Sequence, residues 1–281
     1  MILGNINISP LPFYNDISLQ NHRKAYAFGQ VYPLITYANK LLPFQVVLNS
    51  SATTVLNAEL HLFESSVYYD ITSDLQNIGL SIKICEGYNI LMFPGIVPLG
   101  RTLLEGRYYL AITLNTGIIY SEVFNIVNNV SHCVMVEYCS SENFVLPVGH
   151  VDFSNRFRFR CYIPPQIGKP EYIFEEEATE RLGYSFIESQ VSKKVFKFTF
   201  VAPEYLCDAL RLIRLCDIKI IKEGSTIFEM SSFTMDPKWE ELGDLASVEC
   251  EFETNTVISS VARFAIEKSY DFNNDFNEDY S

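Results

Sequence analysis

Short runs in which apolar and polar residues alternate recur along most of this 281-residue chain. Successive side chains of a β-strand point to opposite faces, so alternation is typical of a strand with one buried face and one solvated face. Strands at this spacing, with few helical segments between them, favour a sandwich. The aromatic content of 14% agrees, because aromatic residues favour strands. The pattern predicts strands over residues 43–48, 58–63, 80–85, 106–112, 118–124, 134–138, 156–160, 194–200, 227–230 and 247–253.

The distribution of these runs predicts a mainly β protein with two tandem β-sandwich-like domains. Residues 30–130 would form the first, an immunoglobulin-like sandwich, and residues 131–266 the second. Residues 1–29 show little periodicity and would form an N-terminal arm or an added edge strand. Residues 267–281 are acidic and polar, which is typical of a flexible tail. Strand patterning restarts near residues 128–150, so we expect the junction of the two domains there.

One helix is expected in the second domain, at about residues 203–216. Pro203 stands at its first turn, where proline is well tolerated. Leu206, Leu210 and Ile213 recur at the spacing of one helix face. The helix would therefore pack an apolar stripe against the β domain.

One predicted strand carries arginine at alternate positions, Arg156, Arg158 and Arg160, with Phe157 and Phe159 between them. A sheet that stacks nucleic-acid bases needs aromatic and cationic side chains on the same face. The alternation places them on opposite faces, which favours a solvated or protein-facing strand. We therefore expect the arginines to pair with carboxylates. Because exposed ion pairs contribute only about 0–1 kcal/mol each, changing all three to serine should barely lower the melting temperature.

Three consecutive glutamates, Glu175, Glu176 and Glu177, offer carboxylates for such pairs. Calcium loops space their ligands at alternating positions around a turning glycine, and this run does neither. We interpret it as a charged loop or as the charged guard of an edge strand. The candidate subunit-contact residues, joined within the chain or across a subunit contact, are Arg156, Arg158, Arg160, Glu175, Glu176 and Glu177.

The net charge of −13 lowers the expectation of nucleic-acid binding, which needs Lys and Arg to displace counterions from phosphates. We expect no specific nucleic-acid partner. The N-terminus lacks the pattern of a signal peptide, and no apolar run approaches the roughly 20 residues of a bilayer span. We therefore expect no membrane partner.

The sequence shows no catalytic, metal or cofactor signature. The seven cysteines form no CxxC pair and are not spaced as zinc ligands with the four histidines, so reduced thiols are expected. GxSxG, HExxH, phosphate-binding glycine loops and the Rossmann fingerprint are absent from the sequence. These patterns favour a non-enzymatic protein without metal or cofactor. The lone Trp239 follows a proline turn and is interpreted as a partly buried anchor rather than a sugar-stacking platform.

Several motifs in the second half carry a family resemblance. They are GKPEY (168–172), FEEE (174–177), SQVSKKVFKF (189–198), APEYLCDAL (202–210) and PKW (237–239), with weaker continuations at 106–110 and 120–124. This sequence resembles poorly characterised proteins encoded in the tail and structural regions of bacteriophages and prophages of Bacteroidetes bacteria, mainly over residues 150–260. The motifs are not active-site motifs, so the resemblance assigns no residue a chemical task.

The resemblance implies a bacteriophage virion structural protein, most simply a tail or tail-associated adaptor holding ring or fibre components together. Its partners would be other virion proteins, in a homo-oligomeric ring or symmetric assembly. It would be located in the virion after assembly in the bacterial host cytoplasm. The alternative is a host-surface glycan-binding module of a phage tail, using exposed aromatic residues in loops such as Glu86-Gly87-Tyr88.

Overall fold

The computed structural model describes residues 2–3, 7–25, 32–37, 40–95, 103–164, 167–181, 184–239, 244–256 and 258–261. Over these residues the chain is mainly β, which confirms that part of the prediction. The predicted tail, residues 267–281, lies outside the described residues.

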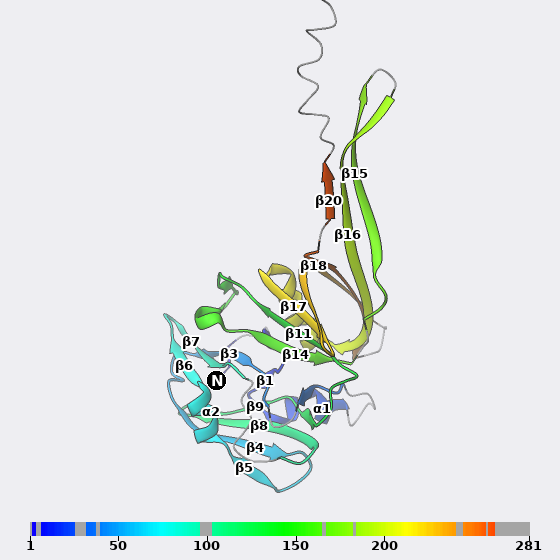
Figure 1. Cartoon of the computed structure of the whole chain (residues 1–281). Helices are drawn as coiled ribbons and strands as arrows, with labels where there is room; N and C mark the ends of the chain where they lie inside the picture. The colour runs from blue at the N-terminus through cyan, green and yellow to red at the C-terminus, as the bar shows by residue number, and fades with distance from the viewer. Residues whose placement is uncertain are drawn as a thin grey trace, which may run out of the picture.

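Two sheets form the first half of the chain (Figure 1). A seven-stranded sheet contains β1 (Phe13–Tyr14), β2 (Ile35–Tyr37), β4 (Val55–Leu62), β5 (Tyr68–Asp70), β8 (Gly106–Leu114), β9 (Gly117–Ser121) and β10 (Phe124–Val127). A three-stranded sheet contains β3 (Phe44–Asn49), β6 (Ser81–Ile84) and β7 (Tyr88–Phe93). Strand order is β1-β9-β8-β10-β2, with β4 between β8 and β5, in the larger sheet and β3-β7-β6 in the smaller one.

Aromatic side chains pack these two sheets together. The ring of Phe13, from the larger sheet, lies 4.6 Å from that of Phe44 in the smaller one, and Phe44 lies 5.4 Å from Phe93. All three rings are buried. This packing is compatible with a β-sandwich, while the immunoglobulin-like assignment of residues 30–130 stays a prediction.

An eight-stranded sheet forms most of the second half. Its strands are β11 (Val134–Cys139), β14 (Phe159–Ile163), β15 (Glu171–Arg181), β16 (Tyr184–Pro203), β17 (Ile218–Glu223), β18 (Thr226–Trp239), β19 (Leu245–Thr254) and β20 (Ile258–Val261). They follow the order β14-β11-β17-β18-β19-β16-β15, with β20 on β16. A small hairpin joins β12 (Phe144–Val145) to β13 (His150–Val151).

The predicted helix corresponds to α3 (Glu204–Leu210) and the 3-10 helix that continues it (Arg211–Leu215). Its predicted stripe is confirmed, because Leu206, Leu210 and Ile213 are buried. The hydroxyl of Tyr138, on β11, donates to the Ala209 carbonyl at 3.1 Å and so ties the helix to the sheet. Further 3-10 helices are Ile17–Leu19 and Ser154–Arg156.

Two short α-helices in the first half were not expected. They are α1 (Asn21–Ala25) and α2 (Thr72–Ile78). Leu75 is the one buried residue of α2, and the helix ends at Gly79, whose φ of 123° suits glycine. A single buried position cannot produce a helical period, which is why alternation alone did not reveal α2.

β16 is shared between the body of the protein and an extension (Figure 1). Its residues 195–203 pair with β19. Its residues 184–194 pair with β15 on one side and, at 189–192, with β20 on the other. We call residues 172–181, 184–194 and 258–261 the arm, which projects away from the body as a three-stranded ribbon.

Candidate functional site

Large apolar side chains lie exposed along the arm. Phe174 and Tyr184 are 69% and 71% exposed, and Tyr172 is 62% exposed. Ile187 and Ile258 are exposed as well. Single exposed apolar residues are normal on a protein surface, whereas several on one narrow element indicate a contact surface.

The three glutamates of β15 pair across the hairpin with β16. Glu175 accepts from Lys193 Nζ at 2.7 Å, Glu176 from Gln190 Nε2 at 2.7 Å, and Glu177 from Ser189 Oγ at 3.0 Å. None of these pairs involves the arginines at 156, 158 or 160. The charged-loop interpretation is wrong, and the run lies in a strand at the end of the strand order.

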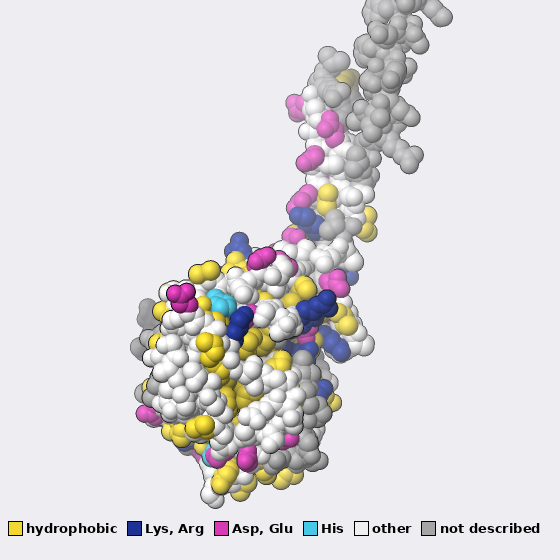
Figure 2. All heavy atoms as spheres, turned by 90° about the vertical axis from the view of Figure 1, so that its left-hand side faces the viewer, with side chains coloured by type: hydrophobic (Ala, Val, Ile, Leu, Met, Phe, Trp, Pro, Cys, Tyr) yellow, Lys and Arg dark blue, Asp and Glu magenta, His cyan; other side chains and the backbone are white. Residues whose placement is uncertain are grey.

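The outer edge of β15 is poorly suited to adding another strand. Charged side chains and bulges are common devices against edge-to-edge pairing. Here Glu175, Glu176 and Glu177 occupy the edge, and the register shifts between Glu177 and Ala178. On the side of β15, the arm therefore presents the faces of its ribbon for contact rather than that edge. Acidic side chains follow the arm, and Lys and Arg side chains lie at its base and on the body (Figure 2).

The arginines do not share one strand, as the alternation predicted. Arg160 lies in β14, while Arg158 precedes that strand and Arg156 ends a 3-10 helix. The backbone turns at Asn155 and Arg156, where φ is 56° and 57°, and a left-handed conformation interrupts an extended run. Phe157 and Phe159 are nonetheless buried, as predicted.

Arg158 and Arg160 do pair with a carboxylate, that of Glu137 on the neighbouring strand β11. Arg158 Nη1 donates to Glu137 at 2.7 Å, and Arg160 donates through Nε at 2.9 Å and through Nη2. Burial alone would raise the pKa of the Glu137 carboxyl. The hydrogen bonds and charges of the two arginines outweigh burial and hold that pKa below its usual value. A subunit-contact role for the six candidate residues stays a prediction.

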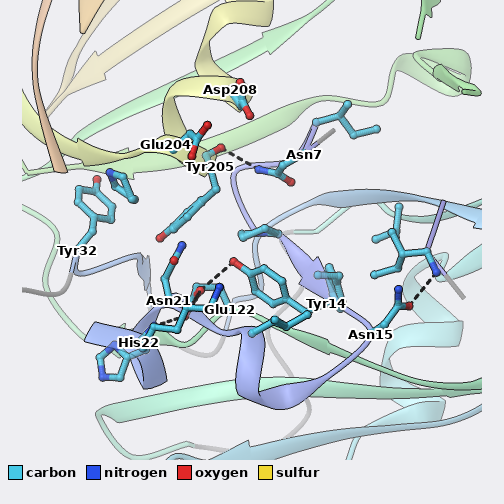
Figure 3. Close-up of a pocket in the computed structure, with 18 of the residues that line it drawn as sticks. Asn7, Tyr14, Asn15, Asn21, His22, Tyr32, Glu122, Glu204, Tyr205 and Asp208 are labelled. Carbon is cyan, nitrogen blue, oxygen red and sulfur yellow. Dashed lines mark hydrogen bonds between the residues drawn. The ribbon is translucent and has the colours of Figure 1, made fainter. Parts of the chain in front are cut away.

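A cavity of about 880 Å³ lies where α1, β1 and α3 meet (Figure 3). Tyr14, His22, Tyr205, Asp208 and the half-exposed Trp239 are among the residues that line it. The hydroxyl of Tyr32, which also lines it, is buried without a hydrogen-bond partner among the described residues. The described residues of the cavity thus offer aromatic rings and carboxylates.

Glu122, in the wall of this cavity, is a structural carboxylate. It accepts hydrogen bonds from the Tyr14 hydroxyl at 3.0 Å and from the backbone N–H groups of Asn21, His22 and Val123 at 2.6, 3.1 and 3.0 Å. Burial raises the pKa of Glu122 although these hydrogen bonds oppose the shift. Its oxygens cap the start of α1 and are engaged within the chain.

Within the described residues, no group of three or more His, Cys, Asp or Glu side chains is placed to hold a metal ion. The seven cysteines are free thiols, and burial raises the pKa of several of them, including Cys161 to about 12. A raised pKa disfavours the reactive thiolate. None of the described helices has the length and apolar character needed to cross a membrane.

No family model and no curated protein matches this chain. The resemblance to phage tail-region proteins therefore stays a prediction from the motifs. Three of those motifs, at residues 168–172, 174–177 and 189–198, fall on β15 and β16 or directly before β15.

The exposed aromatic residues of the arm were not singled out as site residues from the sequence. Tyr172 and Phe174 stand at alternate positions and so share a face of β15. That alternation indicates a strand with an aromatic face, but the adjacent run of glutamates was interpreted by its charge instead. Glu137 carried no signal of its own, because its pairing with Arg160 depends on the register of β11 against β14.

Proposed function

We propose that this chain is a non-enzymatic structural protein of a bacteriophage virion, a tail or tail-associated adaptor that holds ring or fibre components together. The observation that carries the proposal is the arm, a ribbon beyond the body with exposed Tyr172, Phe174 and Tyr184. The motifs of the phage resemblance include the residues of this ribbon. The resemblance of these motifs supports a place in the virion, and the exposed aromatic residues of the arm support a role in assembly.

The continuity of β16 holds the arm away from the body. Residues 195–203 of β16 are fixed in the body sheet, and residues 184–194 continue the same strand. A hairpin that continues a sheet cannot fold back onto its own body without breaking that strand. Burying a large apolar side chain contributes roughly 1.5–3 kcal/mol. A neighbouring subunit that covers Tyr172 and Phe174 would gain stabilisation of this kind.

The test uses purified phage particles and an arm-truncated variant. In this variant, Asn-Gly replaces residues 173–193 and joins Tyr172 to Lys194, which are direct cross-strand partners. Mass spectrometry of particles should find the wild-type chain in multiple copies. Particles produced with the truncated chain should lack it or fail to assemble. Absence of the wild-type chain from purified particles would overturn the proposal.

A second candidate function, recognition of a host-surface glycan, is favoured by the cavity rather than by the loop at residues 86–88. Tyr88 belongs to β7, and its hydroxyl is engaged with His150 Nδ1 at 2.5 Å. The cavity instead combines Trp239, Tyr14 and Asp208, and pockets that orient small ligands often combine apolar rings with a few polar groups. A glycan array probed with wild type and with Trp239→Ala decides this alternative. Binding by wild type that the substitution removes would support it.

A further inference from the structure

We infer that the arm of one copy docks on the outer face of the β11–β17–β18 sheet of a second copy of this chain, in a head-to-tail contact. The inference rests on the proposed assembly function and names the partner of the arm. Four observations carry it: the exposed apolar residues of the arm, its charge, the composition of the receiving face, and the fixed direction of β16 away from its own body.

The receiving face follows from the strand register. Met135 lies opposite Lys222, and Lys222 lies opposite Ile227. Directly paired residues share one face of a sheet, so these side chains lie on the same side. Tyr138 is three residues from Met135, and Ile221 is one residue from Lys222. Because side chains alternate along a strand, both point to the other face of the sheet, where they are buried. The outer face is therefore the side opposite α3.

The outer face carries several apolar side chains, and some of them are exposed. Ile227 is 61% exposed and Ile218, two strand residues before Ile220, is 42% exposed. Ile220 and Met135 on the same face are half-buried. Two exposed isoleucines beside half-buried apolar neighbours form a surface onto which aromatic side chains such as Phe174 and Tyr172 can pack.

Charge favours contact of the arm with this face over contact between two arms. The arm holds five Glu against Arg181, Lys193 and Lys194, a net charge of 3 − 5 = −2. Lys222 on this face stands against Glu137 and Glu229, and beside it lie Arg160 of the neighbouring strand β14 and Arg158, both bonded to Glu137, so that the surface as a whole carries a net charge of 3 − 2 = +1. An arm of net negative charge is repelled by the arm of a second copy. Opposite charges favour this face as the partner and disfavour contact between two arms.

The contact joins two different surfaces, so it is heterologous. Heterologous contacts close into rings when the rotation between copies closes and otherwise propagate as filaments. Each copy would give its arm to one neighbour and receive an arm from another. The contact therefore generates the ring or symmetric assembly that an adaptor of ring components requires.

The experiment measures association by sedimentation velocity over a concentration series. The arm-reversed variant combines Glu176→Lys with Glu180→Lys, and the face-reversed variant combines Lys222→Glu with Ile227→Glu. All four positions are exposed, so the melting temperature of each variant should match that of wild type. Each variant alone should associate at least tenfold more weakly than wild type. An equimolar mixture of the two should recover association, because the reversed charges are again complementary.

Matched controls place equal charge changes elsewhere. Glu86→Lys with Glu142→Lys changes two exposed acids outside the arm, and Arg214→Glu with Leu215→Glu changes an exposed cation and an exposed apolar residue after α3. These controls should associate as wild type does.

Wild type that stays monomeric, reversed variants that associate normally, or a mixture that fails to recover association would each overturn the inference. If the inference is overturned in this way but particles still exclude the arm-truncated chain, only the inference fails and the proposed function stands. Absence of the wild-type chain from particles removes the proposed function instead.

Discussion

Glu137 and Glu122 are both buried carboxylates, yet their surroundings shift their pKa values in opposite directions. Two arginine side chains bond to Glu137 and favour its charged form. Glu122 receives backbone N–H groups and a tyrosine hydroxyl, which are neutral donors, and burial prevails. The charge of the donors therefore decides which effect wins.

This difference predicts opposite pH dependences for Glu137→Gln and Glu122→Gln. The folded-state pKa of Glu137 is lowered, so its stabilisation is present above about pH 4.3, the unfolded value, and is lost as pH falls through the folded-state pKa. The pKa of Glu122 is raised, so its contribution is complete below about pH 4.3 and declines as pH rises. The free energy of unfolding of wild type relative to each variant, measured by urea denaturation across acidic pH, should change in opposite directions. Parallel profiles would contradict the assignment.

Replacing Arg156, Arg158 and Arg160 with serine is now expected to destabilise the fold, contrary to the expectation from alternation alone. The reason is that Glu137, 6% exposed, would stay buried without its cationic partners. Removing the partners of a buried charge costs roughly 3 kcal/mol or more. Arg156→Ser alone is the control and should leave the free energy of unfolding unchanged. A triple variant as stable as wild type would show that Glu137 does not depend on the arginines.

The strands that the sequence predicted best are those whose own residues alternate. Residues 194–200 and 247–253 alternate cleanly and lie in β16 and β19, which pair with each other. Residues 171–181 carry a run of acids with low strand propensity, and they form β15 because β16 offers a long partner. Strand propensity and hydrophobic period are properties of the local sequence, so they do not predict a strand that forms by pairing with its neighbour. For the same reason the arm was not predicted.

The arm should be separable from the stability of the body. The truncation that joins Tyr172 to Lys194 by Asn-Gly, a sequence suited to a tight hairpin turn, keeps residues 195–203 paired with β19. Thermal unfolding followed by circular dichroism should therefore give a melting temperature within a few degrees of that of wild type. Association measured by sedimentation should be lost. A truncated body that fails to fold would show that the arm is part of the core.

The attachment of α3 to the sheet predicts the effect of Tyr138→Phe. The substitution removes the hydroxyl that donates to the buried Ala209 carbonyl, which keeps the backbone N–H of Arg211 as a donor. The free energy of unfolding should fall by about 1–2 kcal/mol. Tyr172→Phe removes a hydroxyl from an exposed arm residue and should have no measurable effect. Equal values for the two variants would exclude a stabilising role for the Tyr138 bond.

The two halves of the molecule are joined by buried polar contacts as well as by apolar packing. Gln45 Nε2 donates to the Asp152 carbonyl at 2.5 Å, and the Asp152 N–H donates to Gln45 Oε1 at 2.9 Å. The Asp152 carboxylate also pairs with Lys83. Farther along, Asn7 Nδ2 donates to the Tyr205 carbonyl at 2.8 Å. Buried apolar residues from both halves form one continuous cluster, so the predicted domains at 30–130 and 131–266 would not be independent in solution.

Limited proteolysis tests this coupling at the scale of the whole molecule. Residues 128–133 connect β10 to β11, and four of them, Asn128, Asn129, Ser131 and His132, are exposed. A protease of broad specificity should therefore cut here, or at the exposed residues 141–143, before it cuts within the paired strands. Because the contacts at Gln45, Lys83 and Asp152 cross the cut, the two fragments should elute together on native gel filtration and separate only in denaturant. Asp152→Ala removes the Lys83 pair and should let the nicked fragments separate at lower urea concentrations.

Fragments of the wild-type protein that separate without denaturant would show that the halves are independent domains. Resistance of both segments, with cutting inside a strand, would place the junction elsewhere.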